Sequence, residues 1–357
     1  MTQDATPKET ETAAEPVTPA GPSIHVAPSP HISKTTLTTR GMMADVLIAL
    51  APAVVMSIVI FRWHAVVQVG LCVLSCLAAE EIFTWMRGQR SRVNDGSAAV
   101  TGVILGLSLP WSAPWYIAVI GSVVAMGLGK AVFGGLGYNI FNPAMVGRAF
   151  VMLSFAKALG AGSYVLARSD IAVVTQATPL TVAKKFAADL AVGKAVAGDM
   201  QLQLEAAGEF WPLFLGQVNG SLGETSALAL LIGGLYLCFR RSASWEIPVG
   251  VLTSAFVLAG IGNLLGLTPF TALHHLIGGA LLFGAFFIAT DPVTSPLTPK
   301  GKFIFGSGIG MLVILLRLFS GYPEGVMFAV LLMNAVTPLI NRWTIPRPVG
   351  GPTPRKA

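Results

Sequence analysis

A pattern of glycine and proline residues occurs twice in this chain, and the two copies are 182 positions apart. The residues are Gly96, Gly102, Pro110 and Pro114 in the first copy and Gly278, Gly284, Pro292 and Pro296 in the second. The stretches between the glycines and the prolines are apolar in both copies. An internal repeat of this length in an apolar chain indicates a duplicated membrane scaffold, with a site where the halves meet.

The composition favours a membrane protein. Hydrophobic residues make up 54% of the chain and charged residues 11%, and the mean hydropathy of +0.70 lies far from that of soluble domains. The charged residues avoid the apolar runs. In a soluble protein a net charge of +6 would suggest nucleic-acid binding. Here basic cytoplasmic loops explain that charge, and we expect no nucleic-acid partner.

Ten apolar segments are candidate membrane spans. They are residues 45–61, 66–86, 97–109, 116–132, 143–159, 225–239, 247–267, 273–290, 303–319 and 326–340. The segment 97–109 would cover only about 20 Å as a helix, against a hydrocarbon core of about 30 Å. We therefore expect it and its repeat partner to be half-helices or broken helices, buried in protein because lipid cannot satisfy irregular backbone.

The distribution of basic residues predicts the orientation. With the N-terminus inside, all the basic clusters that border the spans fall on the cytoplasmic side, and the short outer loops receive only Arg62. Five spans per half is an odd number, so the second half enters the membrane upside down. The predicted fold is an all-α polytopic protein of two inverted five-helix repeats.

Five regions follow from this topology. Residues 1–40 are a polar cytoplasmic tail that we expect to be disordered, without the apolar core of a signal peptide. Residues 41–159 and 225–342 are the membrane repeats. Residues 160–224 form an extracytoplasmic insertion, long enough for a small subdomain. Residues 343–357 are a second cytoplasmic tail, so both termini are cytoplasmic.

The cysteines and histidines give only weak indications of a site. Cys72 and Cys76 share a helix face, so half of a metal site is conceivable, but with Cys238 they are better interpreted as small packing residues. We predict no metal site. His274 and His275 are interpreted as interfacial polar residues, with proton handling as the alternative.

Three blocks of sequence resemble one family, that of the D subunit of the Rnf complex and its relative, the B subunit of the sodium-pumping NADH:quinone oxidoreductase. The blocks are GYNIFNPAMVGRAF at 137–150, GQVNGSLGETS at 216–226 and GYPEGVMFAVLLMNAVTPLI at 321–340. The resemblance extends from residue 41 to about residue 347. The length and the short Pro-rich C-terminus look more like the Rnf protein.

The resemblance implies a covalent flavin. In this family FMN is attached through its phosphate to a threonine of a Ser/Thr-Gly-Ala-Thr type motif, and the matching position is Thr178. Thr175, Ala177 and Pro179 fit the pattern. Gln176 replaces the usual glycine, and Ala172 stands where an acidic residue is often found. A flavin transferase is then an implied partner.

The resemblance also implies a non-covalent riboflavin in the membrane domain, with Asn139 and Asn142 as matching residues. Amides offer both donors and acceptors to the polar edge of an isoalloxazine. The alternative for Asn142 is helix capping, because Pro143 follows it. Asp291 lies at the repeat junction and is a candidate for a flavin or cation site, with a solvated loop carboxylate as the alternative.

Three basic residues lie within or beside spans. Lys130 and Arg317 occupy equivalent spans of the two halves, and we interpret both as snorkelling to lipid phosphate in preference to coordinating an ion. Arg148 could contact either a flavin or a lipid. No residue of this chain is predicted to be catalytic by itself.

The function implied by the resemblance is that of a membrane electron-transfer protein in an ion-translocating oxidoreductase of the bacterial inner membrane, assembled with other Rnf subunits. The chain has no NAD fingerprint and no cysteine set for a cluster, so NADH and ferredoxin chemistry would belong to partners. One alternative is a passive small-solute channel on a urea-transporter-like scaffold. Another alternative is that the chain is the B subunit of the quinone-reducing relative. The transported ion, Na⁺ or H⁺, and the direction of electron flow are not encoded in any motif.

Overall fold

The computed structural model describes residues 38–89, 93–160, 179–191, 208–216, 220–320 and 324–346. Within these ranges every named element is a helix, and the only β pairing is an isolated bridge between Pro110 and Ser221. The prediction of an all-α protein is confirmed. The predicted N-terminal tail lies outside these ranges except for its last residues. Helix α1 begins at Thr39, within that predicted tail. Thr38 caps the helix, because its side chain accepts a hydrogen bond from the Gly41 N–H.

The first half contains five main helices. Their bounds are α1 Thr39–Phe61, α2 Trp63–Met86, α3 Ser97–Ser108, α4 Trp115–Met126 and α5 Pro143–Ser154. Helix α4 continues into a π-helical turn, η2 Gly127–Ala131. A short 3-10 turn, η1 Val93–Asp95, precedes α3, and the short helix α6 Ala156–Gly160 follows α5.

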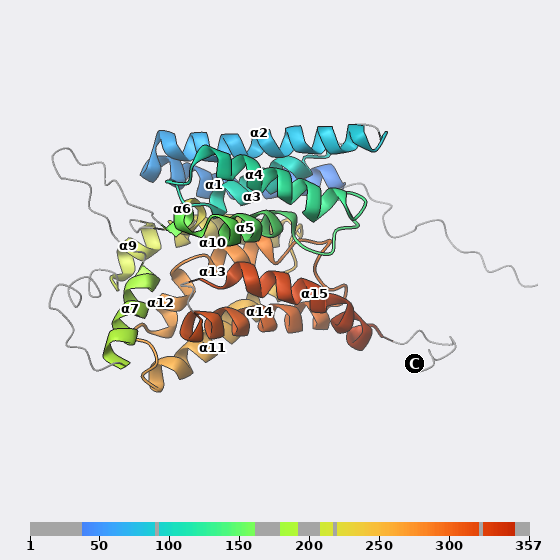
Figure 1. Ribbon diagram of the computed structural model, residues 1–357. Coiled ribbons are helices and arrows are strands. Elements are labelled where there is room, and N and C mark those ends of the chain that lie inside the picture. The colour runs from blue at the N-terminus through green and yellow to red at the C-terminus, as the bar shows by residue number, and fades with distance from the viewer. Residues whose placement is uncertain are drawn as a thin grey trace, which may run out of the picture. The chain divides into compact units, whose positions relative to one another are not determined.

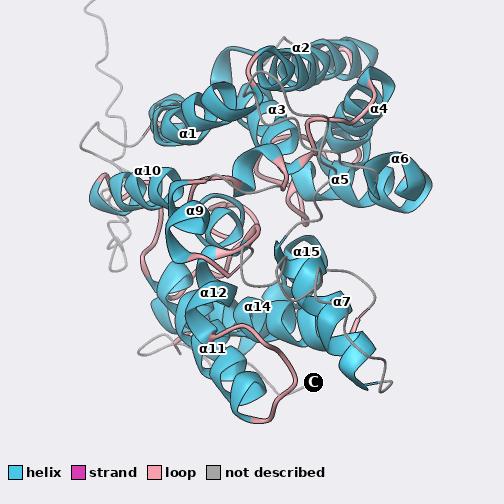
Figure 2. Cartoon of the chain, turned by 90° about the vertical axis from the view of Figure 1, so that its left-hand side faces the viewer, coloured by secondary structure: helices cyan, strands magenta, loops and turns pink. Residues whose placement is uncertain are grey.

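The second half repeats this order. Its elements are α10 Ala227–Phe239, α11 Glu246–Leu264, α12 Ala272–Ile277, α13 Leu281–Phe283, the π-helical turn η4 Gly284–Ile288, α14 Pro299–Phe319 and α15 Val326–Thr344. The segment joining the halves carries α7 Pro179–Ala191, α9 Phe210–Leu215 and the 3-10 turn η3 Leu222–Glu224. Figures 1 and 2 show α2–α5 grouped together and α11, α14 and α15 grouped together, with α10 beside α1.

The helix bounds match the sequence repeat. Displacing the first-half helices by 182 positions places α1 on α10, α2 on α11, α3 on α13 and η4, α4 on α14, and α5 on α15. The packing is repeated as well. Helix α2 contacts α4 as α11 contacts α14, and α4 contacts α5 as α14 contacts α15. The duplication inferred from a few glycines and prolines therefore extends over the whole membrane domain.

Repeat-related helices run in opposite directions. Helix α4 ends in η2, whose Lys130 lines a cavity together with Ser242 and Ala243. The next residue, Ser244, accepts a hydrogen bond of 2.5 Å from Lys302 in the first turn of α14. Helix α14 thus begins at the end of the molecule where its counterpart α4 finishes, as an inverted repeat requires.

The linker helix α7 and the end of α15 lie at opposite ends of α14. The Lys184 ammonium of α7 donates to the Ser320 carbonyl, directly after α14 ends. At the other end, Thr298 Oγ1 donates to Thr344 Oγ1 at the end of α15, over 2.8 Å. Because α14 has 21 residues, it is about 32 Å long. We call its two termini the α7 end and the cavity end of the molecule.

Among the residues that the structure describes, five helices are long and apolar enough to cross a membrane: α1, α2, α11, α14 and α15. Four apolar helices are shorter, namely Ser97–Ser108, Trp115–Ala131, Pro143–Ser154 and Ala227–Phe239. The span predicted at 273–290 is broken between α12 and α13, where Gly279 has a positive φ of 72°. The chain is a multi-pass membrane protein, and the predicted half-helix and broken helix are both present.

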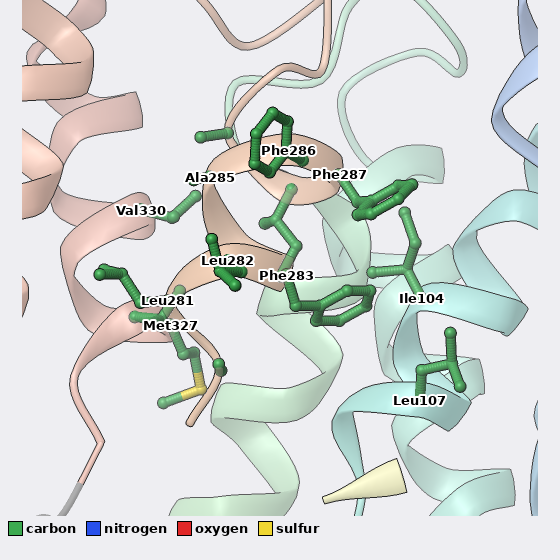
Figure 3. Close-up of a cluster of buried hydrophobic side chains, with 14 of the residues drawn as sticks. Ile104, Leu107, Leu281, Leu282, Phe283, Ala285, Phe286, Phe287, Met327 and Val330 are labelled. Carbon is green, nitrogen blue, oxygen red and sulfur yellow. The ribbon is translucent and has the colours of Figure 1, made fainter. Parts of the chain in front are cut away.

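The two irregular segments meet in the core of the protein. Figure 3 shows Ile104 and Leu107 of α3 facing Phe283 and Phe287 of the α13–η4 segment. All four side chains are buried. A Cβ added at Gly102 would lie 2.6 Å from the Val73 Cα, so this glycine permits close approach of α3 and α2. The irregular backbone is thereby covered by protein and not by lipid, as expected.

Candidate functional site

A cavity of about 80 Å³ lies at the interface of the two repeats. Its polar lining comes from the start of α3, η2, the loop before α5, the turn after α10 and the residues that follow η4. The lining residues that carry polar side chains are Ser97, Thr101, Lys130, Asn139, Asn142, Ser242, Thr290 and Asp291. The structure therefore places Asn139 and Asn142, which the resemblance assigned to riboflavin, in one lining with Asp291, the candidate at the repeat junction.

Asn142 is oriented by capping α5. Its Oδ1 accepts hydrogen bonds from the N–H groups of Ala144 and Met145, at 3.1 and 3.4 Å. Its Nδ2 donates to the Ile288 carbonyl of η4 over 3.3 Å. The capping interpretation is confirmed, and the same side chain ties the first repeat to the second. Capping does not exclude a ligand contact, because one hydrogen of the amide remains available.

Asn139 and Asp291 differ in how their polar atoms are used. Asn139 is 6% exposed; its Nδ2 donates to the Phe141 carbonyl, but its Oδ1 is buried with no hydrogen-bond partner. Asp291 accepts hydrogen bonds from the Val293 N–H and the Thr294 hydroxyl, at 3.1 and 3.3 Å. Asp291 is half-buried, and desolvation raises its pKa above the ordinary value.

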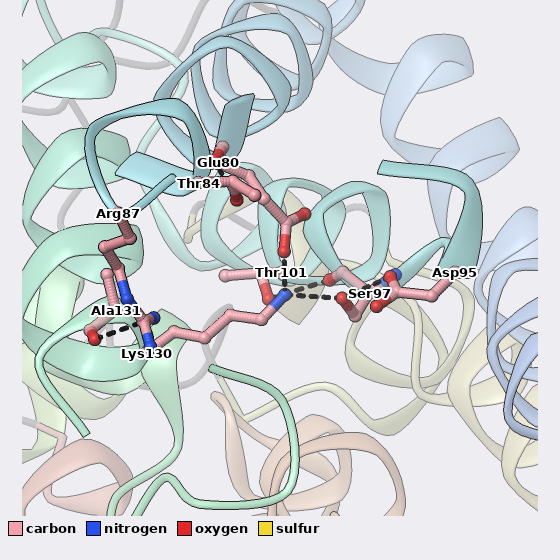
Figure 4. Close-up of polar contacts among 8 residues, drawn as sticks. All are labelled: Glu80, Thr84, Arg87, Asp95, Ser97, Thr101, Lys130 and Ala131. Carbon is pink, nitrogen blue, oxygen red and sulfur yellow. Dashed lines mark hydrogen bonds and ion pairs between the residues drawn. The ribbon is translucent and has the colours of Figure 1, made fainter. Parts of the chain in front are cut away.

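A buried ion pair forms one wall of this site. The Lys130 ammonium contacts the Glu80 carboxylate of α2 and donates to Ser97 Oγ over 2.5 Å, and Ser97 Oγ donates to Asp95. Figure 4 shows Lys130 reaching between these groups. Lys130 and Glu80 are 4% and 5% exposed. The prediction that Lys130 snorkels to lipid is wrong, because a carboxylate inside the protein supplies the charge partner.

A second polar cluster lies at the α7 end of the repeat interface. We call it the carboxylate cluster and define it by Glu224, Glu324, Arg148 and Arg317. The Arg148 Nη2 lies 3.8 Å from Glu224 Oε1 and 3.6 Å from Glu324 Oε2. Glu324 Oε1 also accepts a hydrogen bond of 3.0 Å from the Ala280 N–H, at the break between α12 and α13. Arg148 therefore contacts carboxylates of its own chain.

Arg317 completes this cluster from α14. It is 5% exposed and donates to the carbonyls of His275 and Gly278, at 2.5 and 3.0 Å. These carbonyls lie at the end of α12, where the helix break leaves them without intrahelical partners. The snorkelling interpretation is wrong for Arg317 as well. His275 is also buried, at 4% exposure, and not interfacial; its Nε2 contacts Thr268 Oγ1.

Several candidates predicted from the sequence are not brought into a site. Thr178, with Thr175 and Gln176, lies outside the described residues, and α7 begins at the following Pro179. Cys72 and Cys76 are fully buried on α2, as expected for packing residues. In the described ranges no group of three His, Cys, Asp or Glu side chains could hold a metal ion. Sequence reasoning missed Glu80, Glu224 and Glu324, although each is a rare acidic residue within or beside an apolar run.

The comparisons with known proteins agree with one another. A model of the NQR2, RnfD, RnfE family matches residues 25–350. The chain is 40% identical over 330 residues to the D subunit of the Na(+)-translocating ferredoxin:NAD(+) oxidoreductase complex of Acetobacterium woodii, covering 92% of this chain and 96% of that protein. It is 39% identical to the D subunit of the proton-translocating ferredoxin:NAD(+) oxidoreductase complex of Clostridium ljungdahlii, with 90% and 94% covered. It is 40% identical to the D subunit of the ion-translocating oxidoreductase complex of Stutzerimonas stutzeri, with 87% and 91% covered.

Proposed function

The chain belongs to the NQR2, RnfD, RnfE family, and on that premise we propose that it is the D subunit of an ion-translocating oxidoreductase complex, working with the other Rnf subunits in the inner membrane. The observation that carries the proposal is the cavity at the repeat interface, where Asn139, Asn142 and Asp291 meet. Relatives of similar identity are named for sodium and for proton transport.

We propose that the cavity holds the polar edge of a riboflavin. The buried Asn139 Oδ1 lacks a partner and can accept from a flavin N–H, while the Lys130 ammonium lies in the same lining as a donor. The donor set fits the group. The volume is smaller than the roughly 300–1,000 Å³ of ordinary ligand pockets. Binding would therefore require the lining to open, and the flexible Met42 and Met43 in that lining suit such a movement.

We propose that a second flavin, FMN, is joined to Thr178 by a phosphoester bond. The support is the motif and its position directly before α7, a helix held at one end of the membrane domain by Lys184 and by Leu180 packed with Phe270. A tether of this kind keeps a cofactor at high local concentration near its electron partners. When bound, the flavins supply the one-electron chemistry, and the chain's residues hold and orient them.

A passive channel is the second candidate, because an inverted five-plus-five helix repeat also suits small-solute permeation. The buried Lys130–Glu80 pair at the cavity wall argues against a simple neutral pore. Flavin content separates the two functions, since a channel would purify without colour.

The test uses the complex purified from cells that also make the flavin transferase. We expect the denatured chain to give a fluorescent flavin band in a gel, and acid extraction to release riboflavin. Thr178→Ala should abolish the band together with electron transfer through the complex, while membrane insertion stays normal. Thr175→Ala is the matched control and should keep the band. Fluorescence that persists in Thr178→Ala would exclude this residue as the attachment site, and absence of both flavins from wild type would favour the channel.

A further inference from the structure

The carboxylate cluster lies at positions that the internal repeat relates to the cavity. Three residues in or beside the cluster lie 182 positions after three residues of the cavity lining. The pairs are Met42 with Glu224, Ser97 with Gly279, and Asn142 with Glu324. Because the repeat is inverted, the pairs occupy opposite ends of the interface. Each end therefore carries a polar site, and where Asn142 contributes an amide at the cavity end, Glu324 contributes a carboxyl group at the α7 end.

The two carboxyl groups of the cluster share a single arginine. The distances from Arg148 to Glu224 and Glu324, 3.8 and 3.6 Å, are both longer than a direct N–H···O hydrogen bond. The other arginine, Arg317, donates its hydrogen bonds to two backbone carbonyls. The positive charge available to the two acids is therefore divided between them, and neither acid has a hydrogen-bonded ion pair of its own among the described residues.

Glu224 is the more deeply buried of the two acids. It is 7% exposed, and its Oε1 has no hydrogen-bond partner. The hydroxyl of Ser221, also 7% exposed, likewise lacks a partner and lies beside this carboxyl. The Glu324 side chain is 19% exposed, against 6% for the side chain of Glu224. Glu324 is thus the member of the pair in contact with the surroundings.

The environment of Glu224 favours its neutral form. The charged groups that face it are Glu324, which precedes α15, Arg148 from α5 and Arg317 from α14. Burial and then the Glu324 carboxylate raise the pKa of Glu224 well above its ordinary 4.5, and Arg148 opposes them. Both carboxyl groups lie within 4 Å of the same nitrogen, Arg148 Nη2. A hydrogen bond between two such groups can form only when one of them carries a proton.

We propose that Glu224 and Glu324 form a proton-binding site, in which one proton is shared between the two carboxyl groups and exchanged with water at the α7 end. On release, the O–H bond breaks, the carboxyl group becomes a carboxylate, and the proton passes from Glu224 through Glu324 to water. A role for this proton in ion transport rests on the proposed function. Proton binding itself does not, because it requires neither flavin nor electron transfer.

Infrared spectroscopy of the purified complex tests the site directly. The infrared difference spectrum of wild type minus Glu224→Gln, recorded at neutral pH, should show the carbonyl band of one protonated carboxyl group. This band should shift in heavy water. The difference spectrum of wild type minus Glu324→Gln should also show a change in this band, because the proton is then held by one carboxyl group and no longer shared by two. The exposed Glu209 supplies the control, and Glu209→Gln should leave the band in place. A contribution from Asp291, which none of these substitutions changes, cancels in these differences.

The position of Arg148 gives a second test. Arg148→Gln removes the positive charge that opposes protonation, so the band should persist to higher pH than in wild type. A purely structural role of Arg148 predicts no such shift. A band that is unchanged in Glu324→Gln would overturn sharing, and absence of the band from wild type would overturn proton binding. Flavin content, measured on the same samples, reports the proposed function separately, since loss of flavin leaves these carboxyl groups unchanged.

Discussion

Asn139 and Asn142 are adjacent in the cavity but make different contributions to the fold. Asn139 has an unpaired buried oxygen, whereas Asn142 caps α5 and bonds η4. We expect Asn139→Leu to lower extractable riboflavin without loss of the covalent flavin, since a lost buried hydrogen bond costs about 1–3 kcal/mol, or about 5- to 150-fold in affinity. Combining it with Asn142→Leu should remove the remainder.

The control for this prediction is Asn142→Ser, which keeps a helix-capping oxygen. It should preserve the thermal stability of the complex, whereas Asn142→Leu should lower it through the lost cap. Riboflavin extracted from the purified complex is the measurement, with the fluorescent gel band as the internal reference. Unchanged riboflavin in the double variant would leave these two residues with a capping role alone.

Single residues were predicted less well than their surroundings. Lys130 and Arg317 stand out in the sequence because cations inside spans are costly. The partners of these cations do not stand out. Glu80 lies 50 positions from Lys130. The carbonyls that accept hydrogen bonds from Arg317 are available only because α12 ends at Gly278. A buried pair costs desolvation of both ions, and removal of one partner typically costs about 3–5 kcal/mol. Such pairs are tertiary features, and no local pattern specifies them.

The glycines of the irregular segments determine how closely the helices pack. A Cβ at Gly102 would meet the backbone of Val73, and one at Gly284 would meet the Val326 side chain. We expect Gly102→Leu and Gly284→Leu to lower assembly and flavin retention, since overpacking a core costs about 1–3 kcal/mol or more. Gly70→Leu is the control, because an added Cβ there has no neighbour within 4 Å. The yield of assembled complex in detergent and its flavin content are the measurements. Wild-type values in Gly102→Leu and Gly284→Leu would show that these contacts are not required.

Whole elements were predicted better than their details. The apolar runs located the helices, and the short length of residues 97–109 indicated a half-helix. The π-helical turns η2 and η4 were not foreseen. Such turns depend on packing against neighbours and have no sequence pattern of their own. Both occur where the site needs them: η2 carries Lys130 into the cavity wall, and η4 offers the Ile288 carbonyl to Asn142.

At the scale of the whole molecule, the number of apolar spans and the repeat together determine the architecture. An odd number of crossings per half makes the second half inverted, and the opposite courses of α4 and α14 agree with this. Inversion turns one polar site into two, one at each end of the interface. The sequences at these two sites have diverged, from Asn142 to Glu324, so only superposition of the repeats reveals their relation.

The inverted fold makes a direct prediction about sidedness. Helix α7 packs at one end of α14 and the end of α15 at the other, and α14 is long enough to span the bilayer. In a version with Cys72, Cys76 and Cys238 replaced by alanine, we would place single cysteines at the exposed positions Lys185 and Arg342. An impermeant maleimide should label Lys185→Cys in right-side-out vesicles and Arg342→Cys in inverted vesicles, because basic loops favour the cytoplasmic side.

Each variant, solubilised in detergent, should label fully and serves as its own accessibility control. Labelling of both cysteines from the same side would contradict the inverted-repeat topology, and with it the assignment of the carboxylate cluster and the cavity to opposite faces of the membrane.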